Sequence, residues 1–474
     1  MLAAPPPDLG RSWWLREALA REEFAGPPAP ALDTDTTADV LIMGGGYTGM
    51  WTAWFLKERD PGLDVVLLEA DICGGGPSGR NGGFCDGWWS QVVDLIATFG
   101  PDQAKDLLLA CGRSPNEIGA WCEAHGVDAW FRKGGDLAVM TAASHEGRWL
   151  ATMRAARSIG LDDGYHVLSA SEVRDRVDAP VFGAGIFIDD GASVQPARLA
   201  RGLRRVLLER GVRIHEQTPI RRFGSGRPAV AETPLGTVQA AQVINALGAW
   251  ATPWTTFRHT LTVRGSYMVI TEPAPEMIAE MGWAGGENLR DFRSSVHYVR
   301  TTPDGRIAMG LGGLQPDLAR RIDPRYAYDE RSVRRVADDL LRFFPSFAGV
   351  GFAAGWGGPI NVSGLNLPFF GTTGAGNVHH GLGYTGNGVG PSHLGGKILA
   401  ALATGADDDL TRLAVVTREP KRFPPEPIRS PGMFVANKAI VRKDDREAAG
   451  EVADWATRTV ATLPRRLGFN LGPR

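Results

Sequence analysis

The hydrophobic pattern is clearest near the start of the chain, where two apolar runs flank a helical stretch. Residues 39–43 form a short, mostly apolar run that ends at a glycine cluster, which predicts a buried strand. Residues 49–59 carry tryptophan and phenylalanine at the spacing of one helix face. Residues 64–69 form a second apolar run. The order of strand, helix and strand predicts a βαβ unit.

Helical and strand-like stretches alternate over most of the remaining chain. Residues 100–180 are mixed, with several helical stretches, and residues 258–313 alternate in the manner of strands. Residues 349–396 are dense in glycine. Residues 1–37 are rich in proline and alanine, and we expect them to form an extended arm over the surface. Clearer elements are predicted helices at 196–210 and 331–344, a helix that ends at 404, and predicted strands at 212–216 and 243–247.

The composition is that of a soluble globular protein with room for two domains. The chain has 474 residues, of which 43% are hydrophobic and 22% charged. Its formal net charge of -2 provides no positive field, so we expect no nucleic-acid partner. The longest apolar stretch, 40–56, is interrupted by glycines and predicts no membrane span. No secretory signal is recognisable, and the high arginine, alanine and glycine content favours a GC-rich bacterial source, so a cytoplasmic bacterial protein is expected.

The cysteines give no sign of a metal site. Cys73, Cys85, Cys111 and Cys122 show neither CxxC spacing nor a paired histidine, so we predict that no metal is bound. Four cysteines in a chain of this length favour a reducing compartment.

The strongest chemical signal is a dinucleotide-binding motif between the first predicted strand and helix. Residues 44–49 read Gly-Gly-Gly-Tyr-Thr-Gly and match GxGxxG. Gly44 permits a tight turn, Gly46 permits close approach of a pyrophosphate, and Gly49 permits close packing of helix on sheet. Glu69 follows Gly49 by 20 positions and ends the second strand, where a carboxylate accepts hydrogen bonds from ribose hydroxyls. The sequence therefore predicts a bound dinucleotide, with NADP disfavoured.

Two further glycine-rich loops favour a flavin over a plain nicotinamide cofactor. Residues 74–83 contain Ser78 and Arg80, which can hydrogen-bond a pyrophosphate and neutralise its charge. Residues 381–390 precede a predicted helix, whose free N–H groups would stabilise the negative charge on a reduced flavin. The two ends of the chain would then build one cofactor site.

At these residues the chain resembles the D-amino-acid oxidase superfamily of FAD enzymes, in the glycine and sarcosine oxidase branch and nearest to gamma-glutamylputrescine oxidase-like proteins. The resemblance spans roughly residues 38–405 and rests on 39–49 with Glu69, 74–83, 246–250 and 356–390. It implies non-covalent FAD, because the cysteine that carries flavin in the sarcosine oxidase branch has no counterpart after Cys122. The FAD-binding residues expected from motifs and resemblance are Gly44, Gly46, Tyr47, Thr48, Gly49, Glu69, Ala70, Ser78, Gly79, Arg80, Asn81, Gly82, Gly83, Ile220, Ala246, Gly248, Gly383, Tyr384, Gly386, Asn387, Gly388 and Val389.

The resemblance also implies an α/β fold in which a discontinuous Rossmann-type FAD-binding domain carries an inserted α+β substrate domain. That domain would be built on a large mixed or antiparallel sheet. The expected division is an N-terminal arm at 1–37, an FAD-binding domain at 38–100, 181–255 and 346–410, a substrate domain at 101–180 and 256–345, and a C-terminal extension at 411–474.

The activity implied is oxidation of a C–N bond in a small primary or secondary amine or amino acid. Hydride would pass to flavin N5, and water would hydrolyse the resulting imine. Oxygen or another acceptor would take the electrons. The stretch 305–310 lacks the oxygen-activating lysine of the sarcosine oxidase branch, and Asn366 stands where the family usually has Asp.

Such a reaction needs residues that position the substrate more than it needs a strong base. Aromatic walls and an arginine partner for a substrate carboxylate are therefore the expected features. The catalytic candidates are Tyr384, Trp356, Arg300, His297 and Tyr267, with Trp88, Trp89, Tyr298, Arg264 and Arg293 as further possibilities for walls and carboxylate partners. Two other activities compete: a flavin-dependent monooxygenase, for which no second nucleotide fingerprint is visible, and a non-catalytic flavin or electron-transfer subunit of a larger complex.

Overall fold

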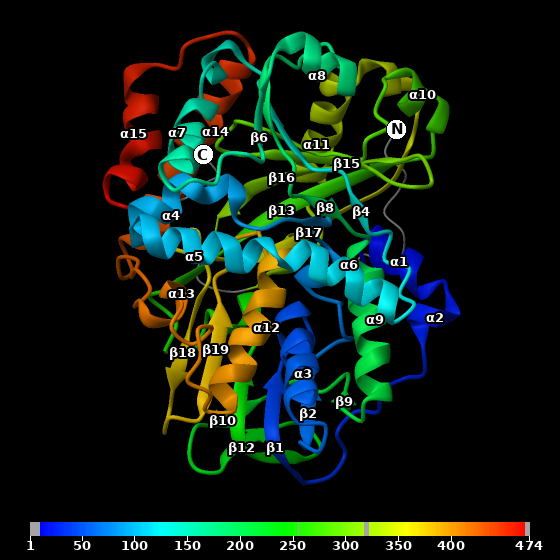
Figure 1. The fold of residues 1–474 in the computed structure, drawn as a ribbon, viewed down its shortest axis with the longest axis vertical. Helices are drawn as coiled ribbons and strands as arrows, with labels where there is room; N and C mark the ends of the chain where they lie inside the picture. The colour runs from blue at the N-terminus through cyan, green and yellow to red at the C-terminus, as the bar shows by residue number, and fades with distance from the viewer. Residues whose placement is uncertain (1–9, 255, 317–321, 470–474) are drawn as a thin grey trace.

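Two large sheets, one in each half of the view in Figure 1, organise the molecule. The computed structural model describes residues 10–254, 256–316 and 322–469. Within these ranges each sheet has eight strands, and a small three-stranded sheet, made of β3 (Phe84–Cys85), β4 (Arg132–Lys133) and β8 (Ala192–Ser193), accompanies them. The expected α/β class with a Rossmann-type domain and a large mixed sheet is confirmed.

The first sheet grows from the predicted βαβ unit. Strands β1 (Thr36–Met43) and β2 (Val65–Leu68) pair in parallel, and α3 (Tyr47–Arg59) connects them. All four residues of β2 are buried, as a strand covered on both faces requires. The other strands are β9 (Arg213–His215), β10 (Arg222–Gly224), β11 (Ala229–Glu232), β12 (Thr237–Asn245), β18 (Phe369–Thr373) and β19 (Val378–Leu382), in the order β10-β11-β12-β1-β2-β9, with β19 beside β12 and β18 beside β19.

Three helices cover one face of this sheet. Figure 1 shows α12 (Val389–Ala403), α3 and α9 (Pro196–Glu209) side by side in front of the strands. The contact between α12 and α3 is close, because a Cβ on Gly396 would lie 2.6 Å from the Cβ of Trp51. The predicted helices near 196–210 and up to 404 are confirmed within two residues.

The second sheet is mixed. Strands β14 (Asn288–Asp291) and β5 (Asp136–Val139) run parallel, and the other neighbours run antiparallel. The remaining strands are β6 (Tyr165–Leu168), β7 (Gly185–Ile188), β13 (Leu261–Thr271), β15 (His297–Thr301), β16 (Ile307–Pro316) and β17 (Phe352–Ser363), in the order β17-β13-β16-β15-β14-β5-β7-β6.

Two strands of this sheet come from ranges that the expected division gives to the FAD-binding part. β7 lies within 181–255 and β17 within 346–410, yet both are hydrogen-bonded into the second sheet. β17 is a long strand that pairs with β13 along almost its whole length. Only after β17 does the chain cross to β18 in the first sheet. The polypeptide therefore passes between the sheets near residues 364–368.

Helices surround the second sheet and extend beyond it. Among them, α11 (Glu330–Phe343) packs on β13 and β16, and its start and end agree with the predicted helix at 331–344. Within the described residues, no helix is both long and apolar enough to cross a membrane. The other helices are α4 (Val92–Phe99), α5 (Pro101–Gly112), α6 (Ser114–Ala124), α7 (Trp149–Ser158), α8 (Ala170–Arg176), α10 (Pro275–Glu280), α13 (Ala414–Thr417), α14 (Arg429–Ala448) and α15 (Trp455–Arg466).

The expectation of an extended N-terminal arm is wrong for much of its described part. This segment contains the helix α1 (Trp13–Leu19), which the Ser12 side chain caps, and the short helix α2 (Glu22–Ala25). Trp14 and Leu15 are fully buried. The helix forms because its apolar side chains pack into the main core, a tertiary contact that the proline-rich composition did not reveal.

A buried ionic cluster fastens this N-terminal segment to the first sheet. Glu216, just after β9, accepts hydrogen bonds from Arg201 (2.9 Å) and Arg204 (3.0 Å) of α9. The same arginines donate to the carbonyls of Phe24 (2.9 Å) and Pro27 (2.6 Å). Burial by itself raises the pKa of Glu216, but hydrogen bonds from Arg204 and Cys73 and the charge of Arg201 outweigh it, so the pKa is lowered.

We predict that Glu216→Gln strongly destabilises the protein, because it leaves two buried guanidinium groups without their anion. The expected loss is about 3–5 kcal/mol in the free energy of unfolding, measured by urea denaturation. Glu209→Gln is the matched control: Glu209 lies on the exposed face of α9, where it pairs with Arg205, and its loss should cost under about 1 kcal/mol. Equal unfolding midpoints for the two variants would contradict the prediction.

Candidate active site

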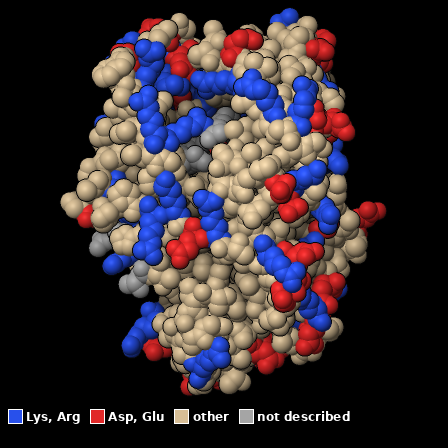
Figure 2. Space-filling model, turned by 60° about the vertical axis from the view of Figure 1, so that its left-hand side comes forward, with Lys and Arg blue, Asp and Glu red and all other residues tan. Residues whose placement is uncertain are grey.

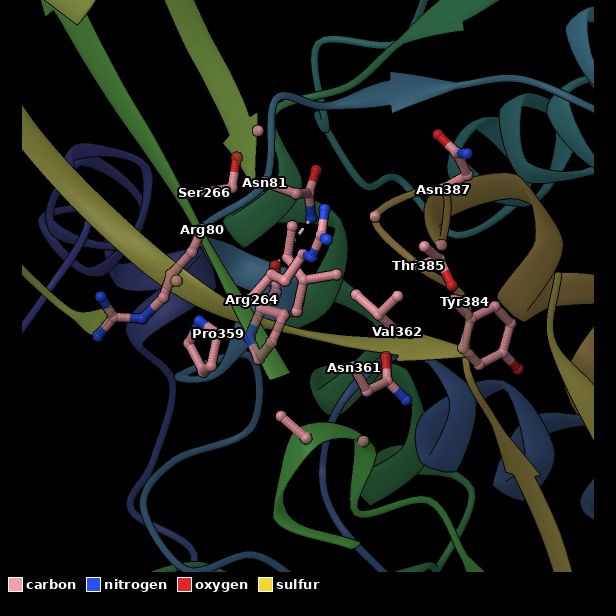
Figure 3. A pocket seen from close by; sticks show the side chains of 18 of the residues that line it. Arg80, Asn81, Arg264, Ser266, Pro359, Asn361, Val362, Tyr384, Thr385 and Asn387 are labelled. Atoms are coloured by element: carbon pink, nitrogen blue, oxygen red, sulfur yellow. Dashed lines mark hydrogen bonds between the residues drawn. The ribbon is translucent and has the colours of Figure 1, made fainter. Parts of the chain in front are cut away.

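One large cavity lies between the two sheets. Its volume is about 930 Å³, near the upper end of the roughly 300–1,000 Å³ typical of ligand pockets. It begins where β1 and β2 end and continues to the second sheet. Figure 3 shows side chains of β13, β17 and the loop before α12 around the same space. The site is thus at the carboxyl ends of parallel strands, where ligands of α/β sheets bind.

The GxGxxG segment forms the floor of this cavity. Gly44 adopts φ +109°, and a Cβ there would lie 2.7 Å from the carbonyl oxygen of Ala246. A Cβ on Gly49 would lie 2.1 Å from the carbonyl oxygen of Gly44, so glycine is required for α3 to start this close to β1. Gly46 is the N-cap of α3 and has no side chain to cover its first N–H groups, although Tyr47 N donates to Ser78 Oγ (2.8 Å). A phosphate can approach this helix end closely.

Glu69 directly follows β2 and presents its carboxylate to the cavity. One oxygen accepts a hydrogen bond from the backbone N–H of Gly45 (2.8 Å), and the other from that of Asp71 (2.9 Å). Burial raises the pKa of Glu69, and these two hydrogen bonds only partly offset it. The carboxylate is therefore fixed in place, with lone pairs left for ribose hydroxyl groups.

The loop 74–83 is rigidly built and is not a flexible surface turn. Asn81 Nδ2 donates to the carbonyls of Pro77 and Ser78, both at 3.0 Å, and its Oδ1 accepts from Gly83 N (2.7 Å). Arg80 Nε donates to the Gly75 carbonyl (2.9 Å). These bonds hold the loop in one conformation, which is what a phosphate-binding loop needs.

The loop before α12 closes the cavity from the C-terminal half of the chain. Thr385 adopts φ +55° and is held there by Ser363 N, which donates to its Oγ1 (3.1 Å). α12 then starts at Val389 with Gly388 as N-cap and no side-chain cap. Its free N–H groups and positive dipole end face the cavity, as the flavin hypothesis requires.

The second sheet supplies a polar wall. Ser266 of β13 and Tyr298 of β15 form a hydrogen bond (2.8 Å) at the cavity surface. Burial raises the pKa of Tyr298 to about 12, so its hydroxyl stays protonated. Arg264 of β13 also lines the cavity, and burial lowers its pKa to about 10, which leaves it charged near neutral pH. A fixed cation beside neutral donors suits a substrate that carries a carboxylate.

Most residues expected to bind the cofactor meet at this cavity. Four do not line it: Gly49, Gly79, Gly83 and Gly383 lie behind the surface, where their missing side chains allow close packing. Those that line it are Gly44, Gly46, Tyr47, Thr48, Glu69, Ala70, Ser78, Arg80, Asn81, Gly82, Ile220, Ala246, Gly248, Tyr384, Gly386, Asn387, Gly388 and Val389.

Of the five catalytic candidates, only Tyr384 lines the cavity; the other four lie behind its wall. Trp356 Nε1 donates to the Arg80 carbonyl (2.9 Å) and so positions the loop 74–83. Arg300 donates to the Val194 carbonyl (2.7 Å). Tyr267 donates to the Arg325 carbonyl (2.8 Å). Direct substrate contact is therefore not expected of these three residues.

His297, the fifth candidate, sits in a buried ionic cluster. Its ring nitrogens contact Asp291 Oδ2 (2.7 Å) and Asp339 Oδ2 (3.1 Å). Burial opposes protonation, but the two carboxylates outweigh it and raise the pKa of His297. His297 thus contacts Asp291, which lines the cavity, and does not itself reach the cavity surface.

Several lining residues were not expected from the sequence. Arg290 of β14 lines the cavity and pairs with Asp136 and with Ser90 Oγ (3.1 Å). Asn437 and Ile440 come from α14, in the C-terminal extension. Asn366, noted as a departure from the family, adopts φ +62°, which asparagine tolerates better than most residues. No local motif marks Arg290, Asn437 or Ile440, because only tertiary packing brings them to the cavity.

The residues present fit FAD. A glycine cradle at a helix N-terminus suits a pyrophosphate, a buried carboxylate suits ribose hydroxyls, and the start of α12 suits the flavin pyrimidine. The four cysteines are buried and unpaired, and none lies among the described lining residues, which fits non-covalent binding.

Comparison with known proteins finds relatives that share most of the length of this chain. The chain is 29% identical to gamma-glutamylputrescine oxidoreductase of Escherichia coli (strain K12) over 390 residues, covering 80% of this chain and 86% of that protein. It is 28% identical to the probable oxidoreductase OrdL of Rhizobium meliloti (strain 1021) over 420 residues, covering 85% and 90%. The crystal structure of glycine oxidase from Geobacillus kaustophilus superposes with a TM-score of 0.66 at 19% identity, covering 81% of this chain and 99% of that one.

The model of one protein family, DAO, described as FAD dependent oxidoreductase, matches residues 39–402. That stretch contains the GxGxxG segment, Glu69, the loop 74–83 and the start of α12, which together line the floor and one end of the cavity. With its fold, its site and its relatives in agreement, the chain belongs to the DAO family of FAD-dependent oxidoreductases.

Proposed function

We propose that this enzyme oxidises a C–N single bond in a small primary or secondary amine or amino acid. When bound, FAD would supply a hydride acceptor for the carbon next to the substrate nitrogen. The nitrogen would release a proton, and water would hydrolyse the resulting imine. The observation that carries the proposal is the continuity of one cavity from the phosphate-binding glycines to the polar wall of the second sheet.

Residues of the first sheet would hold the cofactor. Glu69 would accept hydrogen bonds from the adenosine ribose, and the N-terminus of α3 would bind the pyrophosphate together with Ser78 and Arg80. The N–H groups of residues 386–389 would stabilise negative charge at the flavin pyrimidine. We also propose that the FAD-binding and substrate-binding parts follow the two sheets, with β7 and β17 in the substrate-binding part.

Residues of the second sheet would orient the substrate. Tyr298 and Ser266 offer hydroxyl groups, Tyr384 offers an aromatic wall, and Arg264 offers a cation for a carboxylate. Figure 2 shows Lys and Arg side chains gathered across the upper half of the face that it displays. Such positive charge attracts anions, so it would favour a substrate that carries net negative charge over a simple amine, which is a cation.

The visible spectrum of the purified protein tests the proposal. We expect flavin absorbance peaks that bleach anaerobically when one member of a panel of amines and amino acids is added. Recovery of the peaks in air would identify an oxidase, and recovery only with a dye or quinone would identify a dehydrogenase.

Two outcomes of this measurement would argue against amine oxidation. A flavoprotein that no amine reduces but NADPH does would favour a monooxygenase. A flavin that only a partner protein reduces would favour an electron-transfer subunit. Denatured protein should release all its flavin into the supernatant, because non-covalent binding is expected.

The assignment of Glu69 makes a separate prediction. Glu69→Gln removes the charge that binds the ribose hydroxyls, and we expect FAD affinity to fall roughly 10- to 100-fold, since a hydrogen bond to a charged group contributes about 1.5–3 kcal/mol. Titration of the apoprotein with FAD, followed by quenching of flavin fluorescence, measures the change. Glu58→Gln, on the exposed end of α3 beside Arg210, should bind FAD as the wild type does. Unchanged affinity in Glu69→Gln would refute the role given to this carboxylate.

A further inference from the structure

Helix α14 makes a wall of the cavity although it lies outside the stretch that the family model matches. The match ends at residue 402, and α14 begins at Arg429. Asn437 and Ile440, three residues apart on one face of the helix, both line the cavity. Other buried residues of the same face, such as Met433 and Asp444, turn toward the body of the protein. The C-terminal extension is therefore part of the site.

Buried polar contacts hold this wall in place. Asp444 accepts hydrogen bonds from the backbone N–H groups of Ser295 (2.8 Å) and Ser294 (3.4 Å), and these two serines also line the cavity. Asp445 accepts from Arg293 (2.8 Å). Such contacts fix the rotation of α14 about its axis, and with it the direction in which Asn437 points.

Asn437 is the feature that points to a ligand. It is only 6% exposed, and among the described residues its side-chain amide makes no hydrogen bond. Because no described protein group satisfies this amide, water or a ligand in the cavity must meet its hydrogen-bonding capacity. Its position in the cavity lining offers both its N–H donors and its carbonyl acceptor to a bound molecule.

We propose that Asn437 and Ile440 form a subsite for the non-reacting end of the substrate, which rests on the proposed amine oxidation. Asn437 hydrogen-bonds a carboxamide or carboxylate at that end, and Ile440 packs on the methylene groups before it. The preferred substrate is therefore an extended amine with a terminal polar group.

Matched probes test the subsite. ω-Amino amides and ω-amino acids of three to six carbons, and alkylamines of the same lengths, would be added anaerobically to the FAD-loaded enzyme. We expect the wild type to prefer a polar-ended member over its alkylamine. In Asn437→Ala, the concentration of the polar-ended member that gives half-maximal reduction should rise about tenfold, while its limiting rate of flavin reduction stays unchanged. The half-saturating concentrations and limiting rates for the alkylamines should also stay unchanged.

Lys438→Ala is the matched control, because Lys438 is the next residue along α14 and faces solvent, with its ammonium over the Phe434 ring. Lys438→Ala should change neither the half-saturating concentrations nor the limiting rates of flavin reduction for any probe. Ile440→Ala should weaken the longer members of both series, because it removes packing along the chain and no hydrogen bond.

A binding measurement separates failure of this inference from failure of the proposed function. The best polar-ended probe should raise the thermal unfolding midpoint of the wild type more than that of Asn437→Ala, whether or not it is oxidised. A larger rise of the unfolding midpoint in the wild type, without reduction of the flavin, would support the subsite and contradict the proposed reaction. Equal preference for polar-ended and plain amines, equal shifts in both proteins, or no shift in either would overturn the subsite.

Discussion

A reciprocal pair of hydrogen bonds joins the loop 74–83, which we propose as the cofactor loop, to the second sheet beside the cavity. Trp356 Nε1 of β17 donates to the Arg80 carbonyl (2.9 Å), and Arg80 Nη1 donates to the Gly357 carbonyl (3.2 Å). Arg80 belongs to the loop after β2, while β17 is the edge strand of the second sheet. Because both bonds are partly buried, separating the two sheets at this point would cost free energy by leaving polar groups without their partners.

The N-terminal segment supports the same junction from behind. The ring of Trp14 meets Trp356 edge to face with centroids 5.9 Å apart, and Ser12 Oγ donates to the Gly79 carbonyl (2.5 Å) in the cofactor loop. The guanidinium of Arg300 lies 4.9 Å from the Trp14 ring. Residues that the sequence suggested for substrate contact, Trp356 and Arg300, therefore act on the shape of the cofactor loop.

The C-terminal extension gives the site its other boundary. Family members share a cofactor-binding floor because the geometry of a dinucleotide leaves few alternatives to glycine and a ribose-binding carboxylate. The chemistry of a substrate imposes no comparable pattern, so a wall can be supplied by any segment that reaches the cavity. In this chain α14 reaches it, held by Asp444 against residues 294–295.

The sequence alone determined the parts of the site that local geometry dictates. Gly44 and Gly49 had to be glycine because their backbones approach neighbouring chain atoms, and Glu69 had to follow β2 directly, so a one-dimensional motif predicted where the cofactor would bind. The tertiary structure decided the rest: that α1 is a buried helix, that β17 belongs to the second sheet, that His297 lies behind the wall, and that Asn437 faces the cavity. These placements depend on contacts between residues far apart in the chain. Hydrophobic periodicity shows which face of an element is buried, but it does not specify which other face packs against it.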